Sequence, residues 1–63
     1  MNNMDEGKFL KVYANLPVGL RNEIVLVLPE KGPLTWNAAY IEIENKTQLG
    51  AIILQKLSDL NIV

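Results

Sequence analysis

Few side chains in this chain could carry out nucleophilic or acid–base chemistry. The sequence contains no histidine and no cysteine, so the most frequent general base and the strongest thiol nucleophile of proteins are both missing. Two hydroxyls have polar neighbours, those of Thr47 and Ser58. Thr47 is better explained as a helix N-cap, and Ser58 next to Asp59 has no base to activate it. We therefore expect no catalytic residue, no bound cofactor and no enzymatic activity.

Two carboxylates, Glu42 and Glu44, lie two positions apart. On a β-strand they would share one face and could bind a divalent cation as a pair. Calcium takes about six to eight oxygen ligands, however, so two carboxylates are too few. The lack of histidine and cysteine also removes the usual zinc ligands. We interpret the pair as a solvated surface and predict no metal site.

The charge distribution argues against binding to nucleic acid. The chain has six basic and seven acidic residues, a net charge of −1 and a calculated pI of 5.1, without a block of like charge. Lys46 and Lys56 could present a weak recognition helix, but one lysine inside the last helix is too little to hold a phosphate backbone. A small nucleic-acid-binding regulator therefore remains only the alternative interpretation.

The sequence also lacks the patterns that lead a chain to a membrane. No apolar run approaches the 18 residues or so that a spanning helix needs. The first nine residues, MNNMDEGKF, carry neither a basic region nor an apolar region of the kind found in signal peptides. We expect a cytoplasmic protein that does not bind membranes.

The clearest predicted element is a helix that begins at Thr47. Apolar residues recur there with helical spacing and form one broad stripe, made by Leu49, Ile52, Ile53, Leu57 and Leu60. Thr47 suits the N-cap, and Asn61 suits the left-handed position just past the end. Ile62 would then fold back over Leu57. Gly50 is costly inside a helix, which predicts either that it lies near the helix start or that another element packs closely against it.

A first helix is predicted to run to about Asn15, with Asn3 or Asp5 as its cap and residues 1–4 frayed. Its apolar stripe consists of Phe9, Val12, Tyr13 and Leu16. Pro17 ends this helix and can open a short helical turn through Asn22.

A β-hairpin is predicted between the two helices. Residues 23–28 are short and rich in β-branched side chains, which favours a strand, although a helix continuing from Pro17 also fits the spacing. Residues 29–33, with two prolines and a glycine, suit a hairpin loop. We place the second strand at 38–44, where IEIE alternates. The alternative is a helix with Thr35 as its cap and a stripe formed by Trp36, Ala39, Tyr40 and Ile43.

These elements predict one small α+β domain spanning residues 1–63, in the order helix, short turn, β-hairpin, helix, with the helices on one face of the hairpin. In this arrangement Ile24, Leu26 and Leu28 face the helices. The far face carries Val25, Val27, Trp36 and Tyr40, and we predict it as an interface. A domain of about 60 residues is marginally stable, so a second copy should cover that face. The alternative is that the first helix crosses over and completes a monomeric core.

The function predicted from these observations is a non-catalytic protein-interaction module that self-associates. A homodimer or a protein partner is expected, and neither a cofactor nor a metal ion is required. The sequence contains no motif that identifies the partner, the biological process or a ligand.

Overall fold

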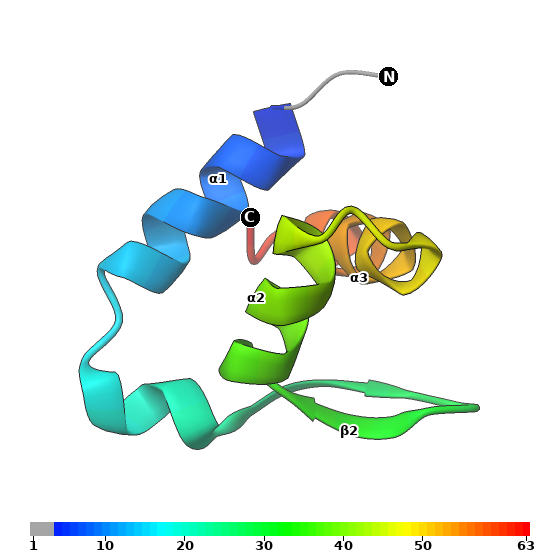
Figure 1. The fold of residues 1–63 in the computed structure, drawn as a ribbon, viewed down its shortest axis with the longest axis horizontal. Coiled ribbons are helices and arrows are strands. Elements are labelled where there is room, and N and C mark those ends of the chain that lie inside the picture. Colours follow the sequence, from blue (N-terminus) through cyan, green and yellow to red (C-terminus); the bar gives the residue numbers. More distant parts are fainter. Residues whose placement is uncertain (1–3) are drawn as a thin grey trace.

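The computed structural model describes residues 4–63, and six elements follow one another there (Figure 1). They are α1 (Met4–Ala14), the 3-10 helix η1 (Val18–Asn22), strands β1 (Ile24–Leu28) and β2 (Gly32–Thr35), and helices α2 (Trp36–Glu44) and α3 (Gln48–Asp59). Figure 1 shows α2 between α1 and α3, with the hairpin across one end of the helical layer. The α+β class, the helical turn and the hairpin with helices packed against it are confirmed.

The N-terminal part of the chain follows the predicted order. Helix α1 buries Phe9 completely and ends at Ala14, shortly before Pro17. Pro17 has φ −56° and ψ 142° and is the N-cap of η1, so the predicted turn through Asn22 is confirmed. Asn3 lies outside the described residues, as do three of the four residues predicted to be frayed. The fourth, Met4, begins α1.

The hairpin is shorter than predicted, and its second strand lies earlier in the chain. Strand β1 pairs antiparallel with β2, which is Gly32–Thr35. The turn between them is only Pro29–Lys31, and Gly32 adopts φ +80°, a conformation that favours glycine. The strand predicted at 38–44 and the five-residue loop are therefore wrong. Strand β2 was not predicted from the sequence because it contains Gly32 and Pro33, and both residue types are uncommon in strands.

A register irregularity between Ile24 and Leu26 changes which side chains of β1 face inward. Leu26 and Leu28 are buried and Val27 is exposed, as the alternation predicts. Ile24, however, is exposed, and Val25 packs against the core. A bulge inserts an extra residue and bends the strand, which explains why the predicted faces of Ile24 and Val25 are exchanged.

Helix α2, Trp36–Glu44, replaces the strand predicted at 38–44. Thr35 is its N-cap and accepts a hydrogen bond from the Ala38 amide at 3.0 Å. Ala39 and Ile43, four positions apart, are both buried, whereas Ile41 is 54% exposed. Helical periodicity therefore describes this segment, and the alternation of Ile41 and Ile43 with glutamates does not reflect a sheet.

Helix α3 has the predicted ends. The Thr47 hydroxyl accepts a hydrogen bond from the Gly50 amide at 2.9 Å. Asn61 adopts φ 60°, and the Ile62 amide donates to the Leu57 carbonyl at 2.9 Å. Gly50 is buried against the backbone of α2, so the predicted close approach of another element is confirmed.

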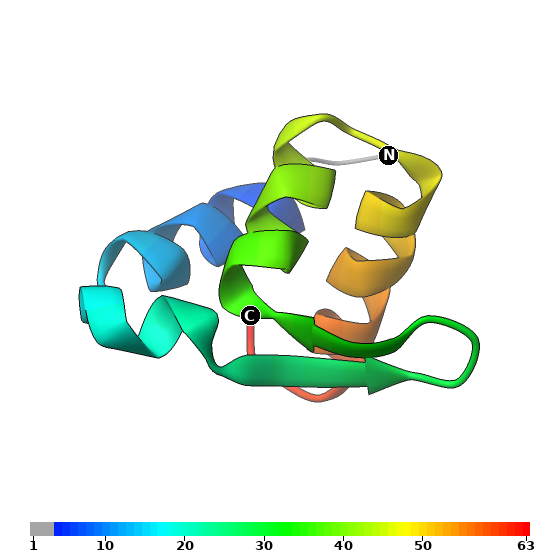
Figure 2. The same cartoon turned by 60° about the horizontal axis from the view of Figure 1, so that its bottom comes forward.

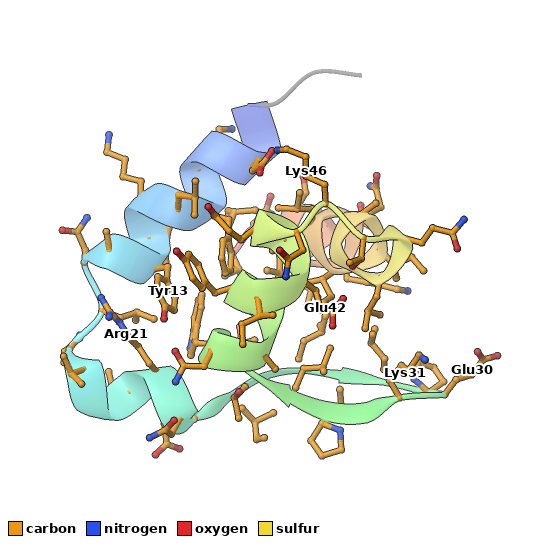
Figure 3. All side chains as sticks on the ribbon, viewed as in Figure 1. Tyr13, Arg21, Glu30, Lys31, Glu42 and Lys46 are labelled. Carbon is orange, nitrogen blue, oxygen red and sulfur yellow. The ribbon has the colours of Figure 1, made fainter. Side chains whose placement is uncertain are left out.

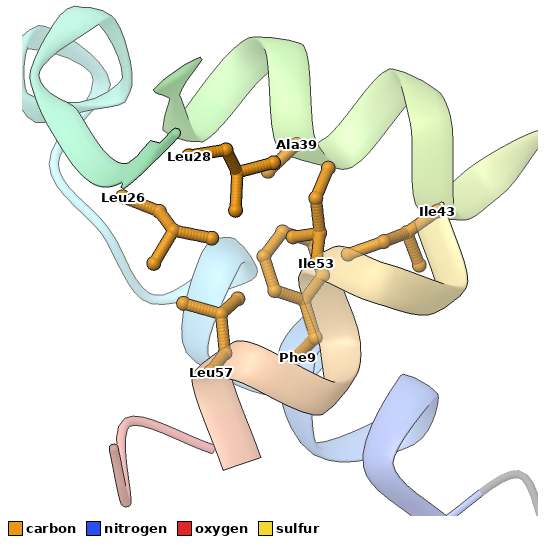
Figure 4. Packing of buried hydrophobic residues seen from close by; sticks show 7 residues of the cluster. All are labelled: Phe9, Leu26, Leu28, Ala39, Ile43, Ile53 and Leu57. Atoms are coloured by element: carbon orange, nitrogen blue, oxygen red, sulfur yellow. The ribbon is translucent and has the colours of Figure 1, made fainter. Parts of the chain in front are cut away.

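All the elements except η1 contribute to a single core (Figure 4). Its buried side chains come from α1, β1, α2 and α3 and are Phe9, Leu26, Leu28, Ala39, Ile43, Ile53 and Leu57. Leu34 of β2 packs against this cluster. The inner face of the hairpin therefore packs against the helices of the same chain.

Candidate functional site

Thr47 and Asp59, two of the residues considered for catalysis, make local structural contacts. Besides capping α3, the Thr47 hydroxyl donates to the Glu42 carboxylate at 2.6 Å. The Asp59 carboxylate accepts from the Gln55 amide at 3.0 Å, one turn back on α3. Because α2 is a helix, Glu42 and Glu44 do not share a strand face. No group of three or more potential metal-ligating side chains is found in the part of the chain that the structure describes.

The two lysines considered for nucleic-acid binding lie at opposite ends of α3. Lys46 precedes the helix (Figure 3), and its ammonium lies 2.9 Å from the Glu6 carboxylate. Lys56 lies ten positions further on, about 15 Å along a helix, in the groove beside the hairpin turn. The structure does not bring the two lysines together, and one of them already has an anionic partner.

The aromatic residues predicted for the interface contact α1 of the same chain. The Trp36 and Phe9 ring centroids are 6.0 Å apart, and the Tyr40 and Tyr13 centroids are 4.5 Å apart with nearly parallel planes. Trp36 and Tyr40 are half-buried and pack against the core. The premise that they lie on an uncovered far face of the hairpin is therefore wrong, because they belong to a helix that α1 covers.

Arg21 of η1 turns inward onto the same aromatic cluster. Its guanidinium carbon lies 4.4 Å from the centre of the Tyr13 ring, and its Nη2 donates to the Tyr13 carbonyl at 3.3 Å. Figure 3 shows Arg21 directed toward Tyr13. The only cation between residues 18 and 28 is therefore withdrawn from the outer surface of this segment.

Four large apolar side chains remain exposed on η1 and β1, and we call them the η1–β1 surface. They are Val18, Leu20, Ile24 and Val27, exposed by 76%, 46%, 51% and 66%. Figure 2 shows η1 leading directly into β1 at the outer side of the hairpin, away from α2. Within residues 6–63, the other exposed large apolar residues are single positions: Ile41 on α2, Ile52 on α3 and Leu60 at the C-cap of α3. Exposed apolar side chains that gather on one stretch of chain often mark a contact with another macromolecule.

The sequence predicted part of this surface. Val27 was expected to face outward and does, whereas Val25 is half-buried. Val18, Leu20 and Ile24 were not included. A signal was available for Val18 and Leu20, because a single helical turn introduced by Pro17 is too short to bury side chains on several sides. The bulge that exposes Ile24 has no sequence signature here.

The surface also has two open grooves. One, of about 440 Å³, lies between the N-terminal part of α1 and the α2–α3 junction and contains the Glu6–Lys46 ion pair. The other, of about 270 Å³, lies between the hairpin turn and α3, with Leu49 and Ile52 in its lining and Lys31 and Lys56 among the polar residues. Thr47 also lines the first groove, and its hydroxyl is engaged there by the Gly50 amide and the Glu42 carboxylate.

Residues 4–63 thus form a small α+β domain with exposed apolar side chains on η1 and β1. Comparison with known proteins adds no family: no family model matches the chain, and no curated protein or solved structure matches it. No helix in the part of the chain that the structure covers is both long and apolar enough to cross a membrane.

Proposed function

We propose that this protein is a small non-catalytic interaction module that self-associates through the η1–β1 surface. The observation that carries the proposal is the concentration of exposed apolar side chains on one continuous segment, Val18–Val27. Dispersed exposed apolar residues are normal on a monomer, but exposed apolar residues gathered on one segment are a feature of interaction sites.

The size of the domain supports the same conclusion. A chain of about 60 residues buries only roughly 60% of the surface that its unfolded form exposes. This chain has no cysteine for a disulfide, and small domains often gain stability from oligomerisation instead. A second copy covering the η1–β1 surface would remove apolar area from water without any change in the core.

Sedimentation velocity over a wide concentration range tests this function. We expect the wild-type protein to shift from monomer to dimer as concentration rises. Val27→Lys should weaken the association by at least about tenfold, equivalent to roughly 1.4 kcal/mol, because it places a charge in an apolar contact.

Ile41→Lys is the matched control, since Ile41 is similarly exposed but lies on α2. It should leave the dissociation constant unchanged. A protein that stays monomeric at every concentration would contradict the proposal, as would equal weakening by the two substitutions.

A further inference from the structure

The groove between the hairpin turn and α3 is lined largely by apolar side chains, and we call it the hairpin–α3 groove. It has a volume of about 270 Å³. Leu28 belongs to the buried core and Leu49 packs against it, so the groove lies directly over the hydrophobic interior. Ile52, which is 50% exposed, and Pro29 also line it. None of these residues belongs to the η1–β1 surface, so the groove is a separate feature of the molecule.

Two lysines line the hairpin–α3 groove, one from each of its walls. Lys31 belongs to the hairpin turn and Lys56 to the last turn of α3, and both are exposed. Among residues 4–63, neither of them forms an ion pair. Glu30, next to Lys31 at the tip of the hairpin (Figure 3), offsets one of the two positive charges. Two ammonium groups against one carboxylate leave the lining with a net charge of +1, although the whole chain carries −1.

The groove between α1 and the α2–α3 junction differs in this respect. Its lysine, Lys46, lies 2.9 Å from the Glu6 carboxylate, so the two charges neutralise each other within the chain. An anionic ligand would have to displace Glu6 before it could reach Lys46. Lys31 and Lys56 have no such carboxylate partner in the described residues. The charges of the two grooves therefore favour an anionic ligand at the hairpin–α3 groove.

The size and openness of the groove favour a side chain of a protein over a free small molecule. Sites that enclose a small molecule usually have volumes of about 300–1,000 Å³ and bury about 70–90% of its surface. The hairpin–α3 groove is smaller than this and open to solvent, so a free ligand would remain largely in water. A side chain of a peptide does not need such enclosure, because the residues before and after it add contacts at the rim.

We infer that the hairpin–α3 groove binds an acidic peptide segment of a partner protein. A large apolar side chain of this segment lies against Leu49 and Ile52, and its carboxylates lie next to Lys31 and Lys56. The apolar side chain supplies most of the affinity because it leaves water, whereas the charges determine which peptides bind. So small a contact gives weak binding, with a dissociation constant on the order of 0.1–1 mM for an isolated peptide.

Titration of the isotope-labelled protein with short peptides, followed by the NMR shifts of its backbone amides, tests this inference. The probe is the acetylated and amidated peptide DELFED, and its counterpart KKLFKK has the same apolar centre with the opposite charge. We expect DELFED to shift amide signals within residues 28–31 and 49–56 and to bind at least about fivefold more tightly than KKLFKK. Its affinity should fall as the salt concentration rises, because exposed ion pairs are screened.

Substitutions in the groove have matched controls elsewhere in the chain. Lys31→Gln and Lys56→Gln should each weaken the binding of DELFED about two- to fivefold, whereas Lys8→Gln, at an exposed position of α1 outside the groove, should not. Ile52→Ala should weaken it at least about threefold. Its control is Ile41→Ala, which is similarly exposed on α2. All five side chains are exposed, so these variants leave the core unchanged.

Several results would overturn the inference. Equal affinities for DELFED and KKLFKK, or no shift with either, would mean that the lysines do not select an acidic peptide. Shifts confined to residues 18–27 would place the peptide on the η1–β1 surface instead.

Two further titrations test other occupants of the groove. Sodium decanoate that shifts the same signals and binds more tightly than DELFED would assign the groove to a lipid. Shifts within residues 49–56 on dilution of the protein alone would assign it to a second copy of the chain. Either result would overturn the assignment to an acidic peptide, whereas selective binding of DELFED that depends on Lys31, Lys56 and Ile52 would support it.

Discussion

At Gly50, α3 packs directly against the backbone of α2, and replacement of this glycine by alanine should destabilise the fold. An added Cβ would lie 2.5 Å from the Glu42 carbonyl oxygen, 2.8 Å from its carbonyl carbon and 3.0 Å from the Ile43 Cα. These are backbone atoms of α2 and cannot rotate away as a flexible side chain would. The two helices would have to separate, and Ile43 is part of the buried core.

The expected magnitude is a balance of two effects with opposite signs. Forcing an extra carbon into a well-packed contact costs about 1–3 kcal/mol. Alanine is a better helix former than glycine by about 1 kcal/mol in a helix interior. Gly50 is only the third residue of α3, so it gains less than that. We expect a net loss of about 1–2 kcal/mol in the free energy of unfolding.

Gly7→Ala provides the matched control, because Gly7 is also helical but its added Cβ would meet nothing within 4 Å. This change should stabilise the protein by up to about 1 kcal/mol. Urea unfolding followed by circular dichroism measures both effects, at one fixed protein concentration because association also contributes to stability. If Gly50→Ala were as stable as Gly7→Ala, the tight α2–α3 contact would not exist in solution.

Two further substitutions test the polar contacts that join the elements. Tyr13→Phe removes the 2.6 Å hydrogen bond from the Tyr13 hydroxyl to the Asn37 side chain but keeps the ring stacked on Tyr40, so urea unfolding should show a loss of about 1 kcal/mol; an unchanged midpoint would mean that water replaces the bond. Thr47→Ala removes the α3 cap and should cost about 0.5–2 kcal/mol by the same assay, whereas Thr47→Ser should retain most of the stability; equal losses in both would assign the effect to the methyl group.

The parts of the fold that the sequence predicted well are those where one local signal has no competitor. Thr47 and Asn61 mark the ends of α3 by side-chain chemistry alone, and both positions behave as expected. Pro17 ends the first helical segment because of its effect on the preceding backbone. Leu26 and Leu28 were assigned to the core from simple alternation.

The strand prediction for residues 38–44 was wrong because two periodicities coincide in this part of the sequence. Ile41 and Ile43 alternate with glutamates as in a half-buried strand, while Trp36, Ala39, Tyr40 and Ile43 have helical spacing. The outcome depends on tertiary packing, since the phenylalanine and tyrosine of α1 stack against the aromatic side chains of α2. Periodicity within one segment cannot reveal stacking partners that lie 27 positions earlier in the sequence, as Phe9 and Tyr13 do for Trp36 and Tyr40.

The placement of α2 also changes the physical basis of the proposed self-association. Trp36 and Tyr40 were the expected anchors, and α1 covers them within the chain, so they no longer provide a reason for a partner. What remains is an uncharged strand whose outward N–H and C=O groups lack a neighbouring strand in the described residues. Water can satisfy those groups, so they do not require a second copy. The exposed valine and isoleucine side chains beside them add a hydrophobic gain that water cannot supply, and it is this combination that favours a second copy over a hydrated edge.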